Sequence, residues 1–291
     1  MSDFLELTFE LGSLDSDAAE AAALACGACA VTFVDAHDDP VLEPHPGELR
    51  LWPSTLVKCL FIGQDDAALI AALAAAVPLD PAHIAAQRIA DRAWEREWLK
   101  DFHALRFGRR LWVCPHHESV SAADAAVVRL DPGLAFGTGT HASTALCLEW
   151  LDARSPAGAC VIDYGCGSGI LGLAALKLGA ARVHAFDIDP QALSATLENA
   201  AANGLAARLV VHELAATLPR GVDLLLANIL AAPLCELVPR FAALLRAGGE
   251  LVLAGLMQHQ SAEVTAAYAA CFDVTSFGYR DGWVCLTGRR L

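Results

Sequence analysis

The spacing of hydrophobic residues near the start of the chain predicts a half-buried strand followed by a helix. Hydrophobic and polar residues alternate from Leu5 to Leu11, and a period of two is typical of a strand with one buried face. We expect an alanine-rich helix to begin near Asp17, whose spacing to Glu20 matches a capping box, and to end at Gly27.

Two further extended segments and a helix complete this pattern. The strands are expected at Ala30–Val34 and Thr55–Ile62, on either side of a polar loop from Asp38 to Glu48. A helix is predicted over Asp65–Ala76. This order of elements favours a small α+β domain, which we place at residues 1–80.

A charged helix is predicted after this domain. The segment Ile84–Phe102 has helical spacing, and Trp94 and Trp98 lie on one side of it. Packing against a domain is the more common use of such a pair, and contact with a substrate is the alternative. We expect residues 81–108 to form a linker between domains.

The second domain, expected at residues 109–291, begins with two short strands and a glycine-rich loop. The strands are predicted at Leu111–Cys114 and Ala126–Leu130, and the helix after the loop has Ser143 and Thr144 in its first turn. Hydroxyl groups and free amides at a helix start suit an anion such as a carboxylate. Capping of the helix alone is the alternative.

A strand, a glycine turn, a helix and a second strand follow over Cys160–Asp189. The first strand ends at Asp163 and the second at Asp187, which completes a unit with the length of a βαβ motif. Glycine lets the backbone approach a ligand, and the helix start directs free N–H groups toward it. Because a carboxylate ending the second strand can bind a ribose diol, the unit predicts a site for a nucleoside-bearing cofactor.

Two cofactors compete for this site. Three glycines match the spacing of a dinucleotide-binding fingerprint: Gly167, Gly169 and Gly172. In that fingerprint the first glycine directly follows the strand, and counted from Gly165 the spacing fails. Asp163 would also repel a pyrophosphate, whereas it suits the positively charged amino group of S-adenosylmethionine. We therefore favour S-adenosylmethionine, with Gly165 and Gly167 among its contacts; a dinucleotide and a purely structural turn are the alternatives.

The rest of the chain predicts a sheet of seven strands that is mostly parallel. Strands and helices alternate, with one helix expected over Pro233–Leu245, and the last two strands are separated only by Arg280–Gly282, as in a hairpin. Such an ending is typical of methyltransferase sheets rather than of dinucleotide-binding domains. Asn228 ends the fourth strand, so we expect it at the same edge of the sheet as the glycine turn, with an ordinary turn residue as the alternative.

Composition narrows the possible partners. The chain of 291 residues is 55% hydrophobic and 19% charged, and its net charge of −14 argues against direct binding of nucleic acid. The uncharged run Ala21–Val34 is too short for a membrane span, and the N-terminus has no signal core. We expect a cytoplasmic protein that attracts a basic partner.

Ten cysteines raise the question of a metal site. Cys26 and Cys29 have CxxC spacing, but no second pair completes a four-ligand set. Cys114 with two neighbouring histidines, His116 and His117, is a further candidate, for which a solvated loop is the simpler interpretation. We expect reduced cysteines among apolar neighbours and no metal.

Several motifs together resemble the bacterial methyltransferases of the PrmA type, which modify ribosomal protein L11. They are LDPGLAFGTGTH (Leu130–His141), DYGCGSGILGLAALKLGA (Asp163–Ala180), DIDPQA (Asp187–Ala192), LLLANILAAPL (Leu224–Leu234) and WVCLTGRR (Trp283–Arg290). The resemblance covers the second domain and reaches the linker through Phe107, whereas the first domain is similar in layout only.

The resemblance implies a fold, an activity and a set of contacts. The fold is an α/β, Rossmann-like class I methyltransferase sheet of seven strands with a small α+β N-terminal domain that grips the substrate. The activity is S-adenosylmethionine-dependent methylation of amino groups of L11, on lysine side chains, the N-terminal α-amine or both, by a monomer. The positions that match the family's cofactor contacts are Thr144, Gly165, Asp187 and Asn228. Family members typically have Phe where Tyr164 stands, a small departure beside the turn.

The acceptor amine must lose its proton before it can attack. We assign no general base, because a lone histidine after a glycine loop, here His141, is more often structural. Loss of the proton to water is sufficient as a hypothesis. A methyltransferase that acts on another protein or on a small molecule is the alternative function.

Overall fold

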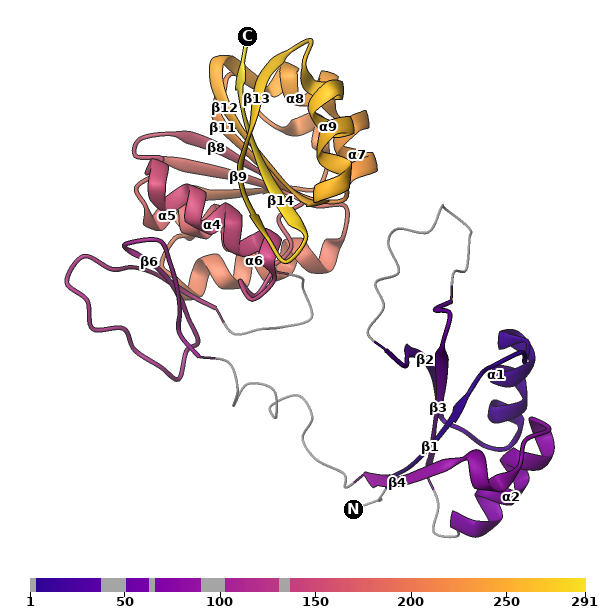
Figure 1. The fold of residues 1–291 in the computed structure, drawn as a ribbon. Helices are drawn as coiled ribbons and strands as arrows, with labels where there is room; N and C mark the ends of the chain where they lie inside the picture. The colour runs from indigo at the N-terminus through magenta and orange to yellow at the C-terminus, as the bar shows by residue number, and fades with distance from the viewer. Residues whose placement is uncertain (1–3, 38–50, 63–65, 90–102, 131–136) are drawn as a thin grey trace. The chain divides into compact units, whose positions relative to one another are not determined.

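The structure, a computed structural model, describes residues 4–37, 51–62, 66–89, 103–130 and 137–291. The chain forms two compact units, Met1–Glu97 and Trp98–Leu291, and each has its own hydrophobic core (Figure 1). Within the described ranges, none of the helices has the length and apolar character that crossing a membrane requires.

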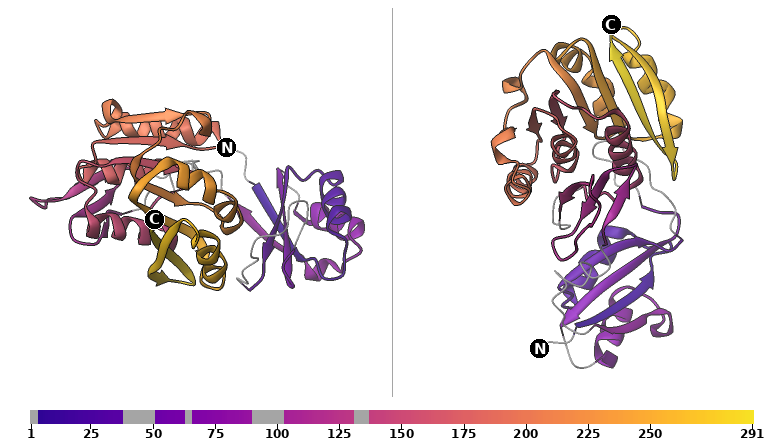
Figure 2. Two further views of the ribbon diagram at one scale, coloured as in Figure 1. Left: turned by 90° about the horizontal axis from the view of Figure 1, so that it is seen from above. Right: turned by 90° about the vertical axis from the view of Figure 1, so that its left-hand side faces the viewer.

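The first unit contains an antiparallel sheet with the strand order β2-β3-β1-β4. Its strands are β1 (Phe4–Glu10), β2 (Ala30–Asp35), β3 (Thr55–Ile62) and β4 (Ala85–Ile89). Two helices, α1 (Ser16–Ala25) and α2 (Asp66–Ala76), cover one face of the sheet (Figures 1 and 2). The alternation predicted for β1 is confirmed, because Leu5, Leu7 and Phe9 are buried in the core beneath these helices.

The cap predicted for α1 is wrong by two residues. Asp15, and not Asp17, is the N-cap, since its side chain accepts a hydrogen bond from the Ala18 N–H at 2.9 Å. The helix begins at Ser16, so Asp17 lies in its first turn, where its charge still favours the helix dipole.

The charged linker helix predicted over Ile84–Phe102 is wrong at its start. Ala85–Ile89 form β4 and pair with β1 along the edge of the first sheet. Most of β4 is exposed, so its sequence lacks the apolar alternation that identifies a half-buried strand. The rest of the predicted helix, with Trp94 and Trp98, lies outside the described residues, as does the loop Asp38–Glu48.

The second unit begins with a small sheet of three strands in the order β5-β6-β7. Strands β6 (Leu111–Cys114) and β7 (Ala126–Arg129) are parallel and confirm two predicted strands. Strand β5 (Leu105–Phe107) pairs antiparallel with β6 and was not predicted, because it is only three residues long.

The main sheet of the second unit has seven strands in the order β10-β9-β8-β11-β12-β14-β13, as predicted in number. They are β8 (Cys160–Tyr164), β9 (Arg182–Phe186), β10 (Leu209–His212), β11 (Val222–Asn228), β12 (Leu245–Met257), β13 (Phe272–Arg280) and β14 (Trp283–Arg290). The first five in this order are parallel, and β14 is antiparallel to both β12 and β13. The predicted antiparallel hairpin at the end of the chain is therefore confirmed.

Helices pack on both faces of this sheet (Figure 1). One core includes residues of α4 (Ala142–Arg154), α5 (Ile170–Lys177) and α6 (Pro190–Ala202). The other includes residues of α7 (Ala231–Glu236), α8 (Val238–Leu244) and α9 (Ser261–Tyr268).

One predicted helix is divided in two. The pattern predicted a single helix over Pro233–Leu245, whereas α7 ends at Glu236, α8 begins at Val238, and Leu237 between them caps both. Pro239 lies in the first turn of α8, where its missing N–H is tolerated, and it could not have continued α7 without losing a hydrogen bond.

Candidate active site

The glycine turn lies at the carboxyl edge of the main sheet, between β8 and α5. Gly165, Gly167 and Gly169 all have positive φ angles, of 77°, 53° and 80°. A Cβ atom on Gly165 would also collide with the side chain of Ile229, which follows β11. The turn therefore requires glycine for both its backbone conformation and its close packing against the next strand.

Asp187 lies directly after β9 and holds the glycine turn. Its Oδ2 accepts a hydrogen bond from the Gly167 N–H at 2.9 Å, and its Oδ1 accepts one from the Asp189 N–H at 3.1 Å. The carboxylate is partly exposed, so it keeps acceptor capacity for a ligand at the edge. The structure thus brings together two of the predicted site residues, Gly167 and Asp187.

Asp163 was predicted to end the first strand of the βαβ unit, whereas β8 continues for one more residue, to Tyr164. The Asp163 side chain is buried. Its Oδ2 accepts a hydrogen bond from the Gly172 N–H at 2.8 Å, while its Oδ1 has no hydrogen-bond partner among the residues that the structure describes. Burial raises the pKa of this carboxyl from 3.8 to about 7, against the opposing effect of the Gly172 hydrogen bond; the nearby charge of Asp187 raises it slightly further. A buried carboxylate with an unpaired oxygen suits a cationic ligand group.

Thr144 and Asn228 meet across the same edge of the sheet. Thr144 is buried in the first turn of α4, and the Asn228 side chain at the end of β11 donates a hydrogen bond to its hydroxyl at 3.1 Å. These two residues are 84 positions apart in the chain. The sequence predicted each of them separately, and the structure joins them in one polar pair.

His141 is the N-cap of α4. Its Nδ1 accepts a hydrogen bond from the Ser143 N–H at 3.3 Å and lies 2.7 Å from the Ser143 hydroxyl. The ring packs edge-on against Trp283, with 4.6 Å between the ring centroids, and burial lowers the pKa of the imidazole. This arrangement is that of a neutral capping side chain, in line with the structural role expected from the sequence.

One exposed hydrophobic residue at this edge was missed by the sequence reasoning. Ile188, next to Asp187, is 91% exposed. An isoleucine after a strand is ordinary in sequence, and only its exposure beside a ribose-binding candidate marks it as a surface for a flat apolar ring.

The cysteine and metal candidates do not form a site. All ten cysteines are free, and the CxxC thiols donate to different backbone carbonyls, Cys26 to Ala72 and Cys29 to Leu60. Across the described ranges, no group of three or more His, Cys, Asp or Glu residues could hold a metal ion. Five of the cysteines are buried as expected: Cys59, Cys114, Cys147, Cys166 and Cys285. The expectation of core cysteines is wrong for Cys29, which is exposed, and only partly met by the four half-buried ones: Cys26, Cys160, Cys235 and Cys271.

A large cavity of the main sheet lies elsewhere. It has a volume of about 700 Å³ and lies at the amino edge, lined by residues that include Arg154, Arg246 and Arg289. None of the predicted site residues lines it. We place the candidate ligand site at the carboxyl edge, because ligands of open α/β sheets bind there. The glycine turn and the half-paired carboxylate of Asp163 are both at that edge.

Comparison with known proteins gives consistent matches. A family model described as "Ribosomal protein L11 methyltransferase (PrmA)" matches residues 3–291. A ribosomal protein L11 methyltransferase of Pseudomonas aeruginosa (strain LESB58) is 48% identical over 290 residues, with coverage of 99% of this chain and 98% of the relative. One from Serratia proteamaculans (strain 568) is 47% identical over 272 residues, with 91% of each chain covered.

A solved structure is also similar. The crystal structure of ribosomal protein L11 methylase from Lactobacillus delbrueckii subsp. bulgaricus has a TM-score of 0.60 and 33% sequence identity, and the match covers 65% of this chain and 99% of that one. The matches in sequence extend from the first strand to the last, over both units. On this basis, the chain belongs to the ribosomal protein L11 methyltransferase (PrmA) family.

Proposed function

We propose that this protein transfers methyl groups from S-adenosylmethionine to amino groups of ribosomal protein L11. The observation that carries the proposal is the half-paired, buried carboxylate of Asp163 beside a glycine turn, in a chain whose relatives are named for this reaction. When bound, S-adenosylmethionine supplies a methyl group on a sulfonium, which an unprotonated amine can take.

The cofactor contacts that we propose lie along the carboxyl edge of the sheet. Gly165 and Gly167 let the backbone approach the cofactor, and Asp187 accepts hydrogen bonds from the ribose. Asp163 neutralises the methionyl ammonium group, and Ile188 offers an apolar surface to the adenine ring. The polar pair of Thr144 and Asn228 completes the set. The Thr144 hydroxyl binds the methionyl carboxylate, and the Asn228 amide lies near the reacting amine.

The acceptor amine is the part of the reaction with the clearest energetic requirement. A lysine with a pKa of about 10.4 needs about 4 kcal/mol to lose its proton near pH 7.4, and an α-amine with a pKa near 8 needs far less. Desolvation in the pocket reduces this requirement. The Asn228 amide and the backbone carbonyls beside it orient the lone pair, and positioning of this kind supplies much of the lowering of the barrier.

The first unit is the proposed substrate-recognition domain. Its helices cover one face of the sheet, and the other face has a hollow of about 430 Å³ lined by Phe4, Glu6, Ala30, Thr32, Lys58, Leu60 and Ile89. Apolar side chains surround one ion pair there, with 3.2 Å between Lys58 Nζ and Glu6 Oε1. A mixed surface of this composition suits a folded protein partner.

The cellular setting follows from the same proposal. We infer that the enzyme acts on L11 in the cytoplasm, as a monomer, without direct contact to nucleic acid. The net charge of −14 supports a basic protein partner and opposes a polyanion.

The proposal is tested with purified L11 and a labelled methyl donor. We expect label on L11, located on amines by mass spectrometry, and a strongly reduced rate with the Asp187→Ala variant. Label on a different protein of a cell extract, or on a small molecule only, would replace L11 as the substrate. No transfer from S-adenosylmethionine to any acceptor would end the proposal.

The role of the first unit is tested with two matched variants. Ile62 on the open face of the sheet is 62% exposed, and Leu24 on α1 is 49% exposed. We expect Ile62→Asp to raise the KM for L11 and Leu24→Asp to leave it unchanged, with the affinity for the methyl donor equal in both. Equal KM values for the two variants would contradict recognition by this face.

A further inference from the structure

One side of helix α6 carries a row of polar side chains that reach two other parts of the second unit. Thr196, Asn199 and Asn203 follow one another at helical spacing, with Asn203 as the C-cap. Each donates a hydrogen bond to a backbone carbonyl outside the helix, to Gly167, Ser168 and Arg129 in turn. The row therefore connects the glycine turn with the end of strand β7.

Asn203 binds the end of β7 through both groups of its amide. Its Oδ1 accepts from the Arg129 N–H at 2.7 Å, and its Nδ2 donates to the Arg129 carbonyl at 2.6 Å and to the Asn199 carbonyl at 2.8 Å. One side chain thus supplies a donor and an acceptor to one backbone residue 74 positions away. Such a pair fixes both the position and the rotation of that residue.

The glycine turn is held by the same helix and in turn holds the chain that follows β7. Thr196 Oγ1 donates to the Gly167 carbonyl at 3.0 Å, and Asn199 Nδ2 donates to the Ser168 carbonyl at 2.9 Å. The Ser168 hydroxyl then donates to the Gly137 carbonyl at 2.6 Å. Arg129 and Gly137 are thus each held to α6, the first directly and the second through the glycine turn.

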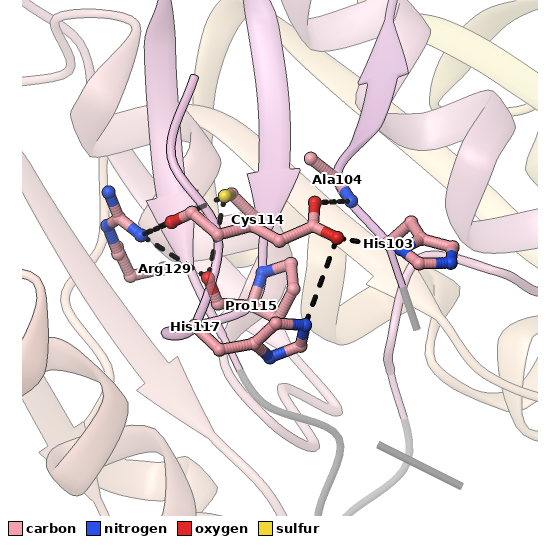
Figure 3. A network of polar contacts seen from close by, with 7 residues as sticks. His103, Ala104, Cys114, Pro115, His117 and Arg129 are labelled. Atoms are coloured by element: carbon pink, nitrogen blue, oxygen red, sulfur yellow. Dashed lines mark hydrogen bonds and ion pairs between the residues drawn. The ribbon is translucent and has the colours of Figure 1, made fainter. Parts of the chain in front are cut away.

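The network continues from Arg129 to the start of the second unit (Figure 3). The guanidinium group of Arg129 donates to the backbone carbonyls of Pro115, at 3.3 Å, and of Glu118. The Glu118 carboxylate accepts from the Ala104 N–H at 2.8 Å and lies 2.7 Å from His103 Nδ1. Arg129 therefore joins Asn203 of α6 to Pro115 and Glu118, and Glu118 in turn holds His103 and Ala104.

We propose that Asn203 is a positioning residue for methyl transfer. It fixes Arg129 of β7 to the C-terminal end of α6, and the same helix holds the glycine turn through Thr196 and Asn199. The turn holds Gly137 through Ser168, just before α4, and Thr144 lies in the first turn of that helix, so the placement of α6 contributes to the alignment of the donor and the acceptor amine. This role rests on the proposed function, and nothing in it requires Asn203 to touch either substrate.

The core of the unit does not depend on this amide. The sheet-facing side of α6 is held by apolar residues, among them Leu193 and Ala200, and Asn203 lies just beyond the last helical turn. Removing its amide leaves those contacts in place. This makes Ala200→Gly a matched control, because it weakens the same helix without touching the hydrogen bonds to β7.

The test compares full-length Asn203→Ala and Ala200→Gly at matched loss of thermal stability. We expect Asn203→Ala to lower kcat for L11 methylation tenfold or more, with the donor Kd changed by less than about threefold, because small misplacements in an active site have large effects on rate. Ala200→Gly should keep kcat within about twofold of the unchanged protein. Asn203→Asp, which retains only the acceptor toward Arg129, should lie between them. Equal kcat values for Asn203→Ala and Ala200→Gly would overturn the proposal.

A second measurement is independent of turnover. Hydrogen exchange should be faster in Asn203→Ala than in Ala200→Gly at the amides of β7 and of residues 137–141, and equal in both at β8. If the unchanged protein transfers no methyl group to L11, the proposed function fails on that result alone, while exchange still decides whether Asn203 fixes this chain. Equal exchange in the two variants would remove the positioning role.

Discussion

Two buried carboxylates of the second unit have opposite surroundings. Asp152, near the end of α4, accepts hydrogen bonds from the backbone N–H groups of Arg109, Arg110 and Leu111 at 2.5, 3.1 and 3.1 Å. Asp163, near the end of β8, accepts one, from Gly172, and its other oxygen has no partner in the described parts of the chain. Both side chains are almost entirely removed from solvent.

We interpret this difference as one between a structural carboxylate and a proposed ligand site. Asp152 ties the turn between β5 and β6 to α4, and Gly108 in that turn leaves no room for a Cβ atom beside the carboxylate. The three backbone hydrogen bonds that Asp152 accepts all join α4 to this turn and the start of β6. Asp163 lies near the carboxyl edge of the sheet, and the ligand that we propose would pair with its unpaired buried oxygen.

Removing the fully bonded carboxylate should have the largest effect. We expect Asp152→Ala to lower the free energy of unfolding by about 4 kcal/mol, because three backbone donors lose their acceptor inside the protein. Denaturant titration measures this change. The matched control is Asp223→Ala, which also removes an acceptor from a backbone N–H, that of Cys160, but at a side chain that is 36% exposed.

The structural role of Asp152 is contradicted if Asp152→Ala and Asp223→Ala lose the same amount of stability. Water can replace much of what Asp223 provides, so we expect that control to lose about 1 kcal/mol. A similar small loss for Asp152→Ala would mean that the turn between β5 and β6 does not depend on its carboxylate.

Asp163→Asn should raise the free energy of unfolding, the opposite of what we expect for Asp152→Ala. Asn can still accept the Gly172 hydrogen bond, but it has no charge to bury. The folded-state pKa of Asp163, about 7, lies above its ordinary value of 3.8, so its protonated form is favoured by folding. The contribution of Asp163 to stability is therefore complete below about pH 4 and is lost as the pH rises through about 7.

The pH dependence of this variant is the sharpest test of the comparison. We expect Asp163→Asn to be more stable than the unchanged protein by up to about 4 kcal/mol near pH 8, and the two to be nearly equal near pH 4. The same variant should bind S-adenosylmethionine more weakly in calorimetry. If Asp163→Asn is destabilised at both pH values, Asp163 is a structural carboxylate like Asp152.

The sequence predicted which candidate site residues lie together better where they belong to one local motif. The glycine turn, Asp163 and Asp187 lie within one βαβ unit, so their proximity follows from the unit itself. The pairing of Thr144 with Asn228 depends on how α4 packs near the end of β11, which no spacing in the sequence records. The contrast between Asp152 and Asp163 was equally invisible, since it depends on which backbone N–H groups surround each carboxylate.

The same limit explains the errors in the fold. The seven strands of the main sheet were predicted because most are buried and continuous in hydrophobic character. β4 was assigned to a helix because it is an exposed edge strand whose pairing with β1 supplies what its own residues do not. The structure of edge strands and of long-range polar pairs depends on residues that are distant in the sequence, so local patterns do not predict it.

Asp187 is intermediate between the two buried carboxylates. It accepts hydrogen bonds from two backbone N–H groups, of Gly167 and Asp189, and is partly open to solvent. We expect Asp187→Ala to weaken S-adenosylmethionine binding by about 2 kcal/mol, through the lost ribose contact and a less well-held glycine turn. Calorimetry measures the affinity, and an unchanged value would remove Asp187 from the site.

Replacing His141 should have the smallest effect of these substitutions, because its ring caps α4 and packs against Trp283. Its Nδ1 is engaged with Ser143, and burial keeps the pKa of the imidazole below its usual value. His141→Ala should lower stability by about 1 kcal/mol, the typical loss of an N-cap. The pH–rate profile for L11 methylation should keep its shape. A step near neutral pH that is present in the unchanged protein and absent in His141→Ala would instead make the histidine a proton acceptor. His141 would then take part in the reaction as well as cap α4.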